Sequence, residues 1–488
     1  MRAPLGYTAA LALALLASAA QARPAQAAHA CSGEIVSARA QTGTFGGRKL
    51  AYSACVERYA AQDASGQPAA SLTAISYVAR PARKGPANRP VLFVFNGGPI
   101  VSSFILHMGA FGPKRLAVPD DISVPLDQFK LVDNPYAPLD VADVVFFDPA
   151  GTGFSAVAPG VAPESQFSVT ADARQLQQLV LGWTRAHGRE ASPVYLVGES
   201  YGTLRAPAAA EQLLAAGRPP AGLILIGQAV NIIEYAQRPG NIISYAVSLP
   251  TLAATAWWHD KAERRGRTFE QFMTDAKAYG GGEYLSVLFA GDSAAPDRVA
   301  AVARELQAFT GILAEEWQRR CLRMSKVEYQ RALFPGERLG TNDARYRGPA
   351  SGPDPFSAVT DVYGQNFLRY LASDLGVESN GYRLYHAGVG GLAGWDWGPN
   401  KTPFGDWPYG TAITALMQGS PDFRLFVSNG YYDTQTTVGA MDYLVNQGGW
   451  PRERVRTKTY QGGHMPYSIE TSLAELSADV RAMVNKEW

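Results

Sequence analysis

The chain has 488 residues, of which 47% are apolar and 18% are charged, a composition that excludes an intrinsically disordered protein. Its 44 Lys and Arg residues nearly balance 43 Asp and Glu residues. No strong electrostatic field therefore favours nucleic acid or an anionic membrane as a partner.

The first 30 residues are predicted to be a secretory signal peptide. Arg2 precedes an Ala- and Leu-rich run over residues 7–20, and three Ala-x-Ala sites follow before Cys31. The apolar run is shorter than the roughly 20 residues that a membrane-spanning helix needs. We therefore expect export to the periplasm or the extracellular medium, with no stable membrane anchor.

Export to an oxidising compartment makes Cys31 and Cys55 candidates for a disulfide. They flank a Gly-containing stretch between two strand-like runs, which can bring the two thiols together. No C-x-x-C or H-E-x-x-H spacing occurs and the six histidines are scattered, so the sequence predicts no metal site. The Gly-x-Gly at Gly151–Gly153 lacks a third glycine, and no cofactor is predicted.

Residues 34–80 alternate as antiparallel strands do. Short apolar runs follow, each ended by turn residues, as expected of strands covered on both faces of a parallel sheet. They are Val91–Phe95, Val144–Phe147, Val194–Val197, Leu223–Ile226 and Leu425–Val427. A helix-like stretch over 170–186 lies between two of them. This alternation predicts an α/β fold with a mostly parallel, doubly wound sheet.

The strand pattern is interrupted by a long insertion. Residues 31–231 are predicted to form the first part of the core and residues 416–488 the second part. Between them, residues 232–415 contain helix-like stretches at 269–279 and 296–323, followed by loops rich in Gly, Pro and Trp. We interpret them as a largely helical cap subdomain, because long insertions in loops cost little stability and often carry specificity.

The segment Val194–Gly202 predicts a catalytic nucleophile. It is an apolar strand that runs into G-x-S-x-G and then into a helix, and a sharp turn there projects the hydroxyl of Ser200 above the sheet. Gly198 and Gly202 remove the side chains that would collide at this turn. The alternative is an ordinary glycine turn. The strand context favours a nucleophile elbow of the α/β-hydrolase type.

A nucleophilic serine needs a base and an orienting acid, which follow in the order Ser, Asp, His in this fold. His464 is the last histidine and lies in a glycine-rich loop near the C-terminus. Asp433 follows the strand-like run Leu425–Val427, where the acid belongs. Asp422 precedes that run and Asp442 lies in a helix-like stretch, so we predict the triad Ser200, Asp433 and His464.

An oxyanion hole requires backbone N–H groups aimed at the developing negative charge. Tyr201, directly after the nucleophile, is predicted to supply one of them. The glycine-rich loop Asn96–Pro99, after an early strand, is predicted to supply the other. The simpler interpretation of this loop is a tight turn that requires glycine, and both can hold at once.

Four motifs in this order resemble the serine carboxypeptidase family, especially its bacterial branch. They are Asn-Gly-Gly-Pro at 96–99, Asp-Pro-Ala-Gly-Thr-Gly-Phe-Ser at 148–155, Gly-Glu-Ser-Tyr-Gly at 198–202 and Gly-His-Met at 463–465. The resemblance covers most of the chain from about residue 72 and is weakest in the cap. It implies removal of single residues from peptide C-termini by acyl-enzyme chemistry.

The resemblance also implies roles for single residues. Ser200, Asp433 and His464 match the triad of the family, and the N–H groups of Gly98 and Tyr201 match its oxyanion hole. The residues that match the site for the substrate's terminal carboxylate are Asn96, Gly97 and Glu199. A protonated Glu199 can donate a hydrogen bond to a carboxylate, whereas an ionised one would repel it, and family peptidases accordingly favour acidic pH.

Two positions depart from the family pattern. Position 100 is Ile where the family usually has Gly, and a branched residue restricts the backbone beside the oxyanion loop. Position 110 is Ala where many members place a second Glu. Without that partner carboxyl, Glu199 loses one force that raises its pKa, so we expect a weaker preference for acid or altered carboxylate recognition.

The sequence thus predicts an exported serine carboxypeptidase that acts on peptides with a free C-terminus. A second hypothesis keeps the nucleophile and changes the substrate or acceptor, giving an esterase, amidase or acyltransferase. A third is a non-catalytic secreted binding protein, which the presence of all three triad residues disfavours.

Overall fold

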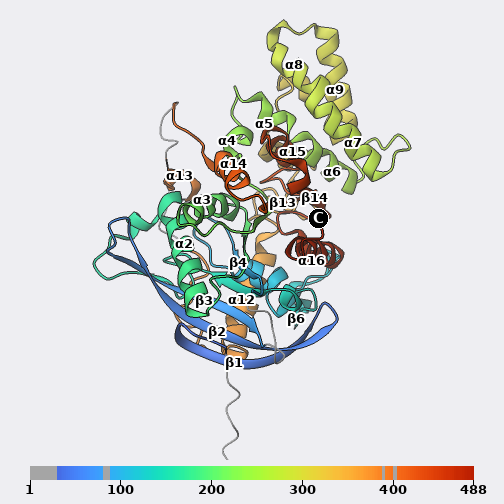
Figure 1. Cartoon of the computed structure of the whole chain (residues 1–488). Helices are drawn as coiled ribbons and strands as arrows, with labels where there is room; N and C mark the ends of the chain where they lie inside the picture. Colours follow the sequence, from blue (N-terminus) through green and yellow to red (C-terminus); the bar gives the residue numbers. More distant parts are fainter. Residues whose placement is uncertain (1–29, 81–87, 387–390, 399–403) are drawn as a thin grey trace, which may run out of the picture.

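A computed structural model describes residues 30–80, 88–386, 391–398 and 404–488. Residues 1–29 of the predicted signal peptide lie outside these ranges. A central ten-stranded sheet has helices on both faces (Figure 1). The order of its strands is β1 (Glu34–Phe45), β2 (Arg48–Gln62), β3 (Pro68–Ala79), β7 (Asp143–Phe147), β4 (Val91–Phe95), β9 (Val194–Glu199), β10 (Gly222–Ile226), β13 (Arg424–Gly430) and β14 (Val455–Tyr460), with β8 (Ala156–Val157) paired to β3.

The strands from β7 to β14 form the parallel part of the sheet. Every residue of β4, β7 and β10 is buried, which is why these strands are wholly apolar in the sequence, apart from Asp143 at the start of β7. The five predicted apolar runs correspond to β4, β7, β9, β10 and β13, and the predicted α/β-hydrolase fold class is confirmed. β14 was not predicted, because its sequence Val-Arg-Thr-Lys-Thr-Tyr is that of a half-exposed edge strand.

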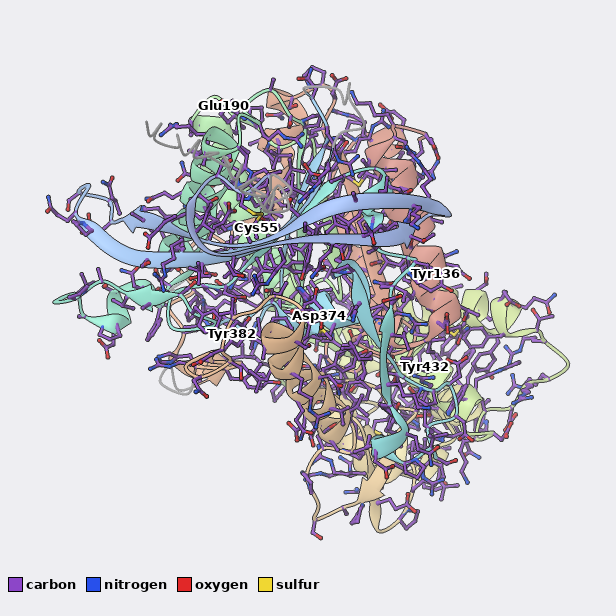
Figure 2. The ribbon with its side chains drawn as sticks, turned by 90° about the horizontal axis from the view of Figure 1, so that it is seen from below. Cys55, Tyr136, Glu190, Asp374, Tyr382 and Tyr432 are labelled. Carbon is purple, nitrogen blue, oxygen red and sulfur yellow. A yellow bond between two sulfur atoms is a disulfide. The ribbon has the colours of Figure 1, made fainter. Side chains whose placement is uncertain are left out.

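The first three strands are antiparallel, as predicted for residues 34–80. Cys31 and Cys55 form the predicted disulfide, and Cys55 lies among the blue N-terminal strands in Figure 2. Beside it, the buried carboxylate of Glu57 accepts a hydrogen bond from the Ser32 N–H at 2.7 Å and is paired with the His187 ring at 3.1 Å. The residues that precede β1 are therefore anchored to the sheet by a covalent bond and by a carboxylate.

Helices cover both faces of the sheet and leave two hydrophobic clusters between helices and strands. One face is covered by α2 (Val169–Ala186), α3 (Gly202–Ala215), α14 (Tyr409–Gly419) and α15 (Val438–Gln447). The other is covered by α12 (Ser357–Ser373), α16 (Glu470–Val484) and the short helices α1 (Phe104–Leu106) and η1 (His107–Phe111). Alternate residues of β4 enter the two clusters, as the pleat of a strand requires.

The chain between β10 and β13 holds the predicted insertion. Its first helices are α4 (Ile232–Tyr235), α5 (Ile242–Ala246), α6 (Leu249–Trp258), α7 (Phe269–Tyr279), α8 (Leu285–Ala290), α9 (Pro296–Thr310), α10 (Ala314–Arg319) and α11 (Lys326–Ala332), followed by the hairpin strands β11 (Glu337–Leu339) and β12 (Arg347–Pro349). Buried residues from 245 to 344 share a hydrophobic cluster of their own, and α8 and α9 project away from the sheet (Figure 1).

Later residues of the insertion pack directly on the sheet. Residues 346–382 contribute to the cluster under α12 and α16, and residues 395–397 and 407–417 contribute to the cluster under α2 and α3. The insertion therefore takes part in three packing groups, and the bounds predicted for the cap remain a prediction. In the described ranges, no helix is both long and apolar enough to cross a bilayer.

Candidate active site

Ser200 lies on a tight turn between β9 and α3. Its backbone has a φ of +59°, a conformation that few residues other than glycine adopt, and its N–H donates to the carbonyl of Ile226 at 3.0 Å. A Cβ at Gly198 would lie 2.3 Å from the carbonyl oxygen of Gly202. The structure thus forms the strand–turn–helix elbow that the G-x-S-x-G motif predicts, and the first glycine of the motif is required by close backbone approach.

The loop 96–99 lies directly against this elbow. A Cβ at Gly97 would lie 2.5 Å from the backbone nitrogen of Tyr201, and one at Gly202 would lie 3.3 Å from the carbonyl oxygen of Asn96. Gly98 has a φ of +109°, which explains the second glycine of the loop. The two N–H groups predicted for the oxyanion hole, those of Gly98 and Tyr201, therefore belong to segments in contact. Their catalytic role stays a prediction.

Ile100 fits at the end of this loop. Its side chain is buried in the hydrophobic cluster under α2 and α3, and its backbone does not have a positive φ. Its carbonyl accepts a hydrogen bond from the N–H of His386. The departure at position 100 is therefore accommodated by packing.

A buried ion pair holds the loop in place. Arg205 on α3 is paired with Asp172 on α2 at 2.7 Å, and both side chains are buried. The same guanidinium donates to the carbonyls of Asn96 at 2.6 Å and Pro99 at 2.8 Å. Sequence reasoning missed this pair, although a charged residue in the Ala-rich sequence after the elbow is the kind of signal that indicates a buried partner.

A second buried carboxylate anchors the start of α1. Asp148 accepts hydrogen bonds from the N–H and the hydroxyl of Ser103, both at 2.7 Å, and from the hydroxyl of Tyr382 at 2.8 Å. The Asp148–Ser155 motif therefore fixes the polypeptide that follows the oxyanion loop.

Asp433 and His464 are brought together as predicted. The Nδ1 atom of His464 lies 2.7 Å from Oδ2 of Asp433. The other carboxylate oxygen accepts from the backbone N–H groups of Gln435 at 2.8 Å and Thr436 at 3.0 Å. Asp433 is thus held from several sides, and an acceptor at Nδ1 keeps the proton there, so that Nε2 remains able to accept one.

The two rival aspartates lie elsewhere. Asp422 is exposed before β13. Asp442 is on α15 and pairs with Lys277 at 2.9 Å.

His464 lies at the same end of the sheet as Ser200. A Cβ at Gly227 would lie 3.0 Å from two atoms of the His464 ring, and Gly227 directly follows Ile226, the partner of the Ser200 N–H. Burial lowers the pKa of His464, but the charge and hydrogen bond of Asp433 outweigh it and raise that pKa above its ordinary value. The nucleophile and the base are thus both placed beside the residues that end β10, Ile226 and Gly227.

Glu199, the last residue of β9, is 3% exposed. Burial raises its pKa to about 7. The side-chain amide of Asn96 donates to its Oε1 at 3.0 Å, and the Asn96 side-chain oxygen accepts from the N–H of Leu106 at 3.0 Å. Burial therefore raises the pKa of Glu199, as a second carboxyl at position 110 would also do. Glu199 consequently carries a proton at acidic pH.

Within the described residues, one group brings three metal-ligating side chains together, namely Cys31, Cys55 and Glu57. Both of its sulfurs are joined in the disulfide, so they cannot act as thiolate ligands.

Comparison with known proteins bears on this site. Residues 69–221 match the profile of the serine carboxypeptidase family. The matched part includes the oxyanion loop and the elbow and ends before Asp433 and His464. No curated protein matches the chain.

Solved structures similar to this chain include an esterase from Thermogutta terrifontis, with 14% identity, 88% of this chain and 98% of that chain covered, and a TM-score of 0.33. A proline iminopeptidase from Mycobacterium smegmatis has 13% identity over 92% of this chain and 98% of that chain, with a TM-score of 0.31. A homoserine O-acetyltransferase from Bacillus anthracis has 12% identity over 92% and 96%, with a TM-score of 0.32.

The strand order, the elbow and the family match agree with one another. They support a serine hydrolase with its nucleophile at the end of β9. The chain has the α/β-hydrolase fold, and over residues 69–221 it matches the serine carboxypeptidase family.

Proposed function

We propose that the protein is an exported serine carboxypeptidase that hydrolyses the last peptide bond of peptides with a free C-terminus. Ser200 attacks the scissile carbonyl, His464 takes the hydroxyl proton and passes it to the leaving amine, and Asp433 holds the imidazole. The N–H groups of Gly98 and Tyr201 stabilise the oxyanion. Water then attacks the acyl-enzyme and releases the shortened peptide. The disulfide between Cys31 and Cys55 supports export.

The observation that carries this proposal is the buried carboxyl of Glu199 beside the nucleophile. Hydrolysis of a simple ester needs a triad and an oxyanion hole, but no second carboxyl next to the serine. A carboxyl with a pKa of about 7 is protonated at acidic pH and can then donate to a substrate carboxylate. The side-chain amide of Asn96 has two N–H groups, and one of them donates a hydrogen bond to Glu199.

The pH dependence follows from these two groups. His464 must be neutral to act as a base, so activity falls at low pH as this ring is protonated. Glu199 must be protonated to bind a carboxylate, so recognition of a free C-terminus is lost as the pH rises through about 7. An amidated or esterified substrate lacks the second dependence, because it presents no charge to Glu199.

The test is release of the C-terminal amino acid from an N-blocked dipeptide between about pH 4 and pH 8, with the C-terminally amidated dipeptide alongside. We expect release that needs Ser200 and prefers the free carboxylate below about pH 7. The control variant is Ser200→Ala. Cleavage of a simple ester without release from either dipeptide would instead identify an esterase or acyltransferase. No reaction of Ser200 with a fluorophosphonate would indicate a binding protein.

A further inference from the structure

Tyr467 connects the loop of the base to the residue beside the nucleophile. It lies in the short helix η8 (Pro466–Ser468), three residues after His464, and its side chain is 2% exposed. Its hydroxyl donates a hydrogen bond to Oε2 of Glu199, while the Asn96 amide donates to Oε1 at 3.0 Å. The two oxygens of Glu199 are therefore held by donors from two different elements.

The polypeptide opposite has no side chain where the Tyr467 ring lies. A Cβ at Gly109 would lie 2.3 Å from Cε2 and 2.5 Å from Cδ2 of that ring. The next residue is Ala110, which offers no polar atom in its side chain. The ring thus takes the space that a larger residue in η1 would need, and its hydroxyl reaches Glu199 from that side.

Few groups other than these donors act on Glu199. His464 favours its ionised form and Asp433 disfavours it. Tyr363 of α12 is also near, since both Glu199 and Tyr467 interact electrostatically with it. The hydroxyl of Tyr363 is buried and has no hydrogen-bond partner in the described part of the chain. No other phenol reaches the carboxyl among the hydrogen bonds of the described residues.

We propose that Tyr467 is a positioning residue for recognition of the substrate's terminal carboxylate, because its hydroxyl holds the Glu199 carboxyl in one orientation. This proposal rests on the carboxypeptidase function proposed above. The last torsion of a Glu side chain has a broad minimum, so a carboxyl with one donor rotates more freely than a carboxyl with a donor on each oxygen. The hydrogen bond from Tyr467 also favours the ionised form of Glu199 and so lowers the pKa of this carboxyl.

Two effects of Tyr467→Phe follow, and the variant keeps the ring that packs on Gly109. First, kcat/KM for the free-carboxylate dipeptide at about pH 6 should fall about tenfold, while an N-blocked amino-acid ester stays within about twofold. Second, removal of a donor to the ionised carboxyl raises the pKa of Glu199. The alkaline limb for the dipeptide should therefore move upward by about one pH unit.

Tyr460→Phe is the matched control. The hydroxyl of Tyr460 also bonds to a carboxylate, that of Asp479 at 2.6 Å rather than that of Glu199, and Tyr460 is as buried as Tyr467. We expect wild-type selectivity and a wild-type alkaline limb from this variant. In a Glu199→Gln background, which has no titration at position 199, Tyr467→Phe should move no limb.

The possible results separate the two proposals. Unchanged selectivity and an unchanged limb in Tyr467→Phe would overturn the positioning role, as would equal losses on dipeptide and ester in both Tyr variants. A wild-type protein that does not distinguish the free dipeptide from its amide would overturn the carboxypeptidase function, and the role of Tyr467 with it. If Tyr467→Phe proves too unstable to assay below neutral pH, the ratio of dipeptide to ester kcat/KM is compared with that of the wild type near pH 7, and an unchanged ratio there would overturn the positioning role.

Discussion

The nucleophile and the acid–base pair of this site are built in different ways. Ser200, the oxyanion loop and Arg205 lie within about 110 residues of one another, and close backbone approaches and one buried ion pair hold them. Asp433 and His464 follow more than 220 residues after Arg205. Asp433 is held by hydrogen bonds from the backbone just after it, and His464 is held by contact of its loop with the insertion.

The difference lies in the kind of force. On the nucleophile side, a buried guanidinium binds two carbonyls of the oxyanion loop and one carboxylate. On the acid–base side, Gly463 lies so close to residues 342 and 343 of the insertion that a Cβ would be 2.1 Å from the Asn342 carbonyl oxygen. Loss of Arg205 on the nucleophile side therefore leaves an unpaired buried charge. An added side chain at Gly463 on the acid–base side instead creates a steric conflict. The insertion thus supports the loop that carries His464.

Asp433→Asn should have the largest effect on activity. An amide in place of the carboxylate can present its N–H₂ group to Nδ1 of His464, which favours the wrong tautomer, and we expect kcat to fall about ten-thousandfold. The measurement is hydrolysis of an activated ester, with circular dichroism to show that the variant is folded. Asp442→Asn, on α15, is the matched control and should retain activity. Equal losses in both variants would remove Asp433 from the triad.

Arg205→Met tests the charged side. The substitution leaves the Asp172 carboxylate buried without its cation, and we expect the free energy of unfolding to fall by about 3–5 kcal/mol. The measurement is denaturant-induced unfolding. The double variant Arg205→Met with Asp172→Leu removes both charges and should recover most of that loss. A double variant no more stable than the single one would mean that the bonds from Arg205 to the oxyanion loop, rather than the ion pair, carry the stability.

The nucleophile side could be predicted from the sequence because its signals are local. The wholly apolar runs of β4 and β9 and the glycines at 97, 98, 198 and 202 follow from burial and backbone approach within a few residues. Asp433 and His464 were predicted from their order along the chain and the strand before them. Their contact needed no knowledge of the insertion, because both lie in loops at the same end of the sheet.

Other features could not be predicted because they depend on contacts between distant residues. The pairing of Arg205 with Asp172 requires two helices to face each other, and neither residue belongs to a motif. Tyr467 reaches Glu199 across 268 positions. The polar edge strand β14 has no apolar run, and the packing of residues 346–382 and 407–417 on the sheet depends on contacts that no local pattern shows.

Gly463→Ala tests the steric side. The added methyl group would meet the backbone of the insertion, which cannot move as a flexible side chain can, and we expect a loss of about 1–3 kcal/mol in the free energy of unfolding. Activity should fall as well, because His464 is the next residue. Gly410→Ala is the control, since nothing lies within 4 Å of its Cβ position and it lies in α14, where alanine favours the helix. Wild-type stability and activity in Gly463→Ala would show that the loop and the insertion are not in firm contact.

Lys277→Gln should have the smallest effect, and it asks whether charge also joins the insertion to the core. Lys277 of α7 pairs with Asp442 of α15 at 2.9 Å, and the two side chains are 36% and 32% exposed. Water screens such a pair, so we expect a loss of less than about 1 kcal/mol in the free energy of unfolding, measured by a double-mutant cycle with Asp442→Asn. A coupling as large as that of Arg205 with Asp172 would contradict the division proposed here, because ion pairing would then hold the acid–base side as firmly as it holds the nucleophile side.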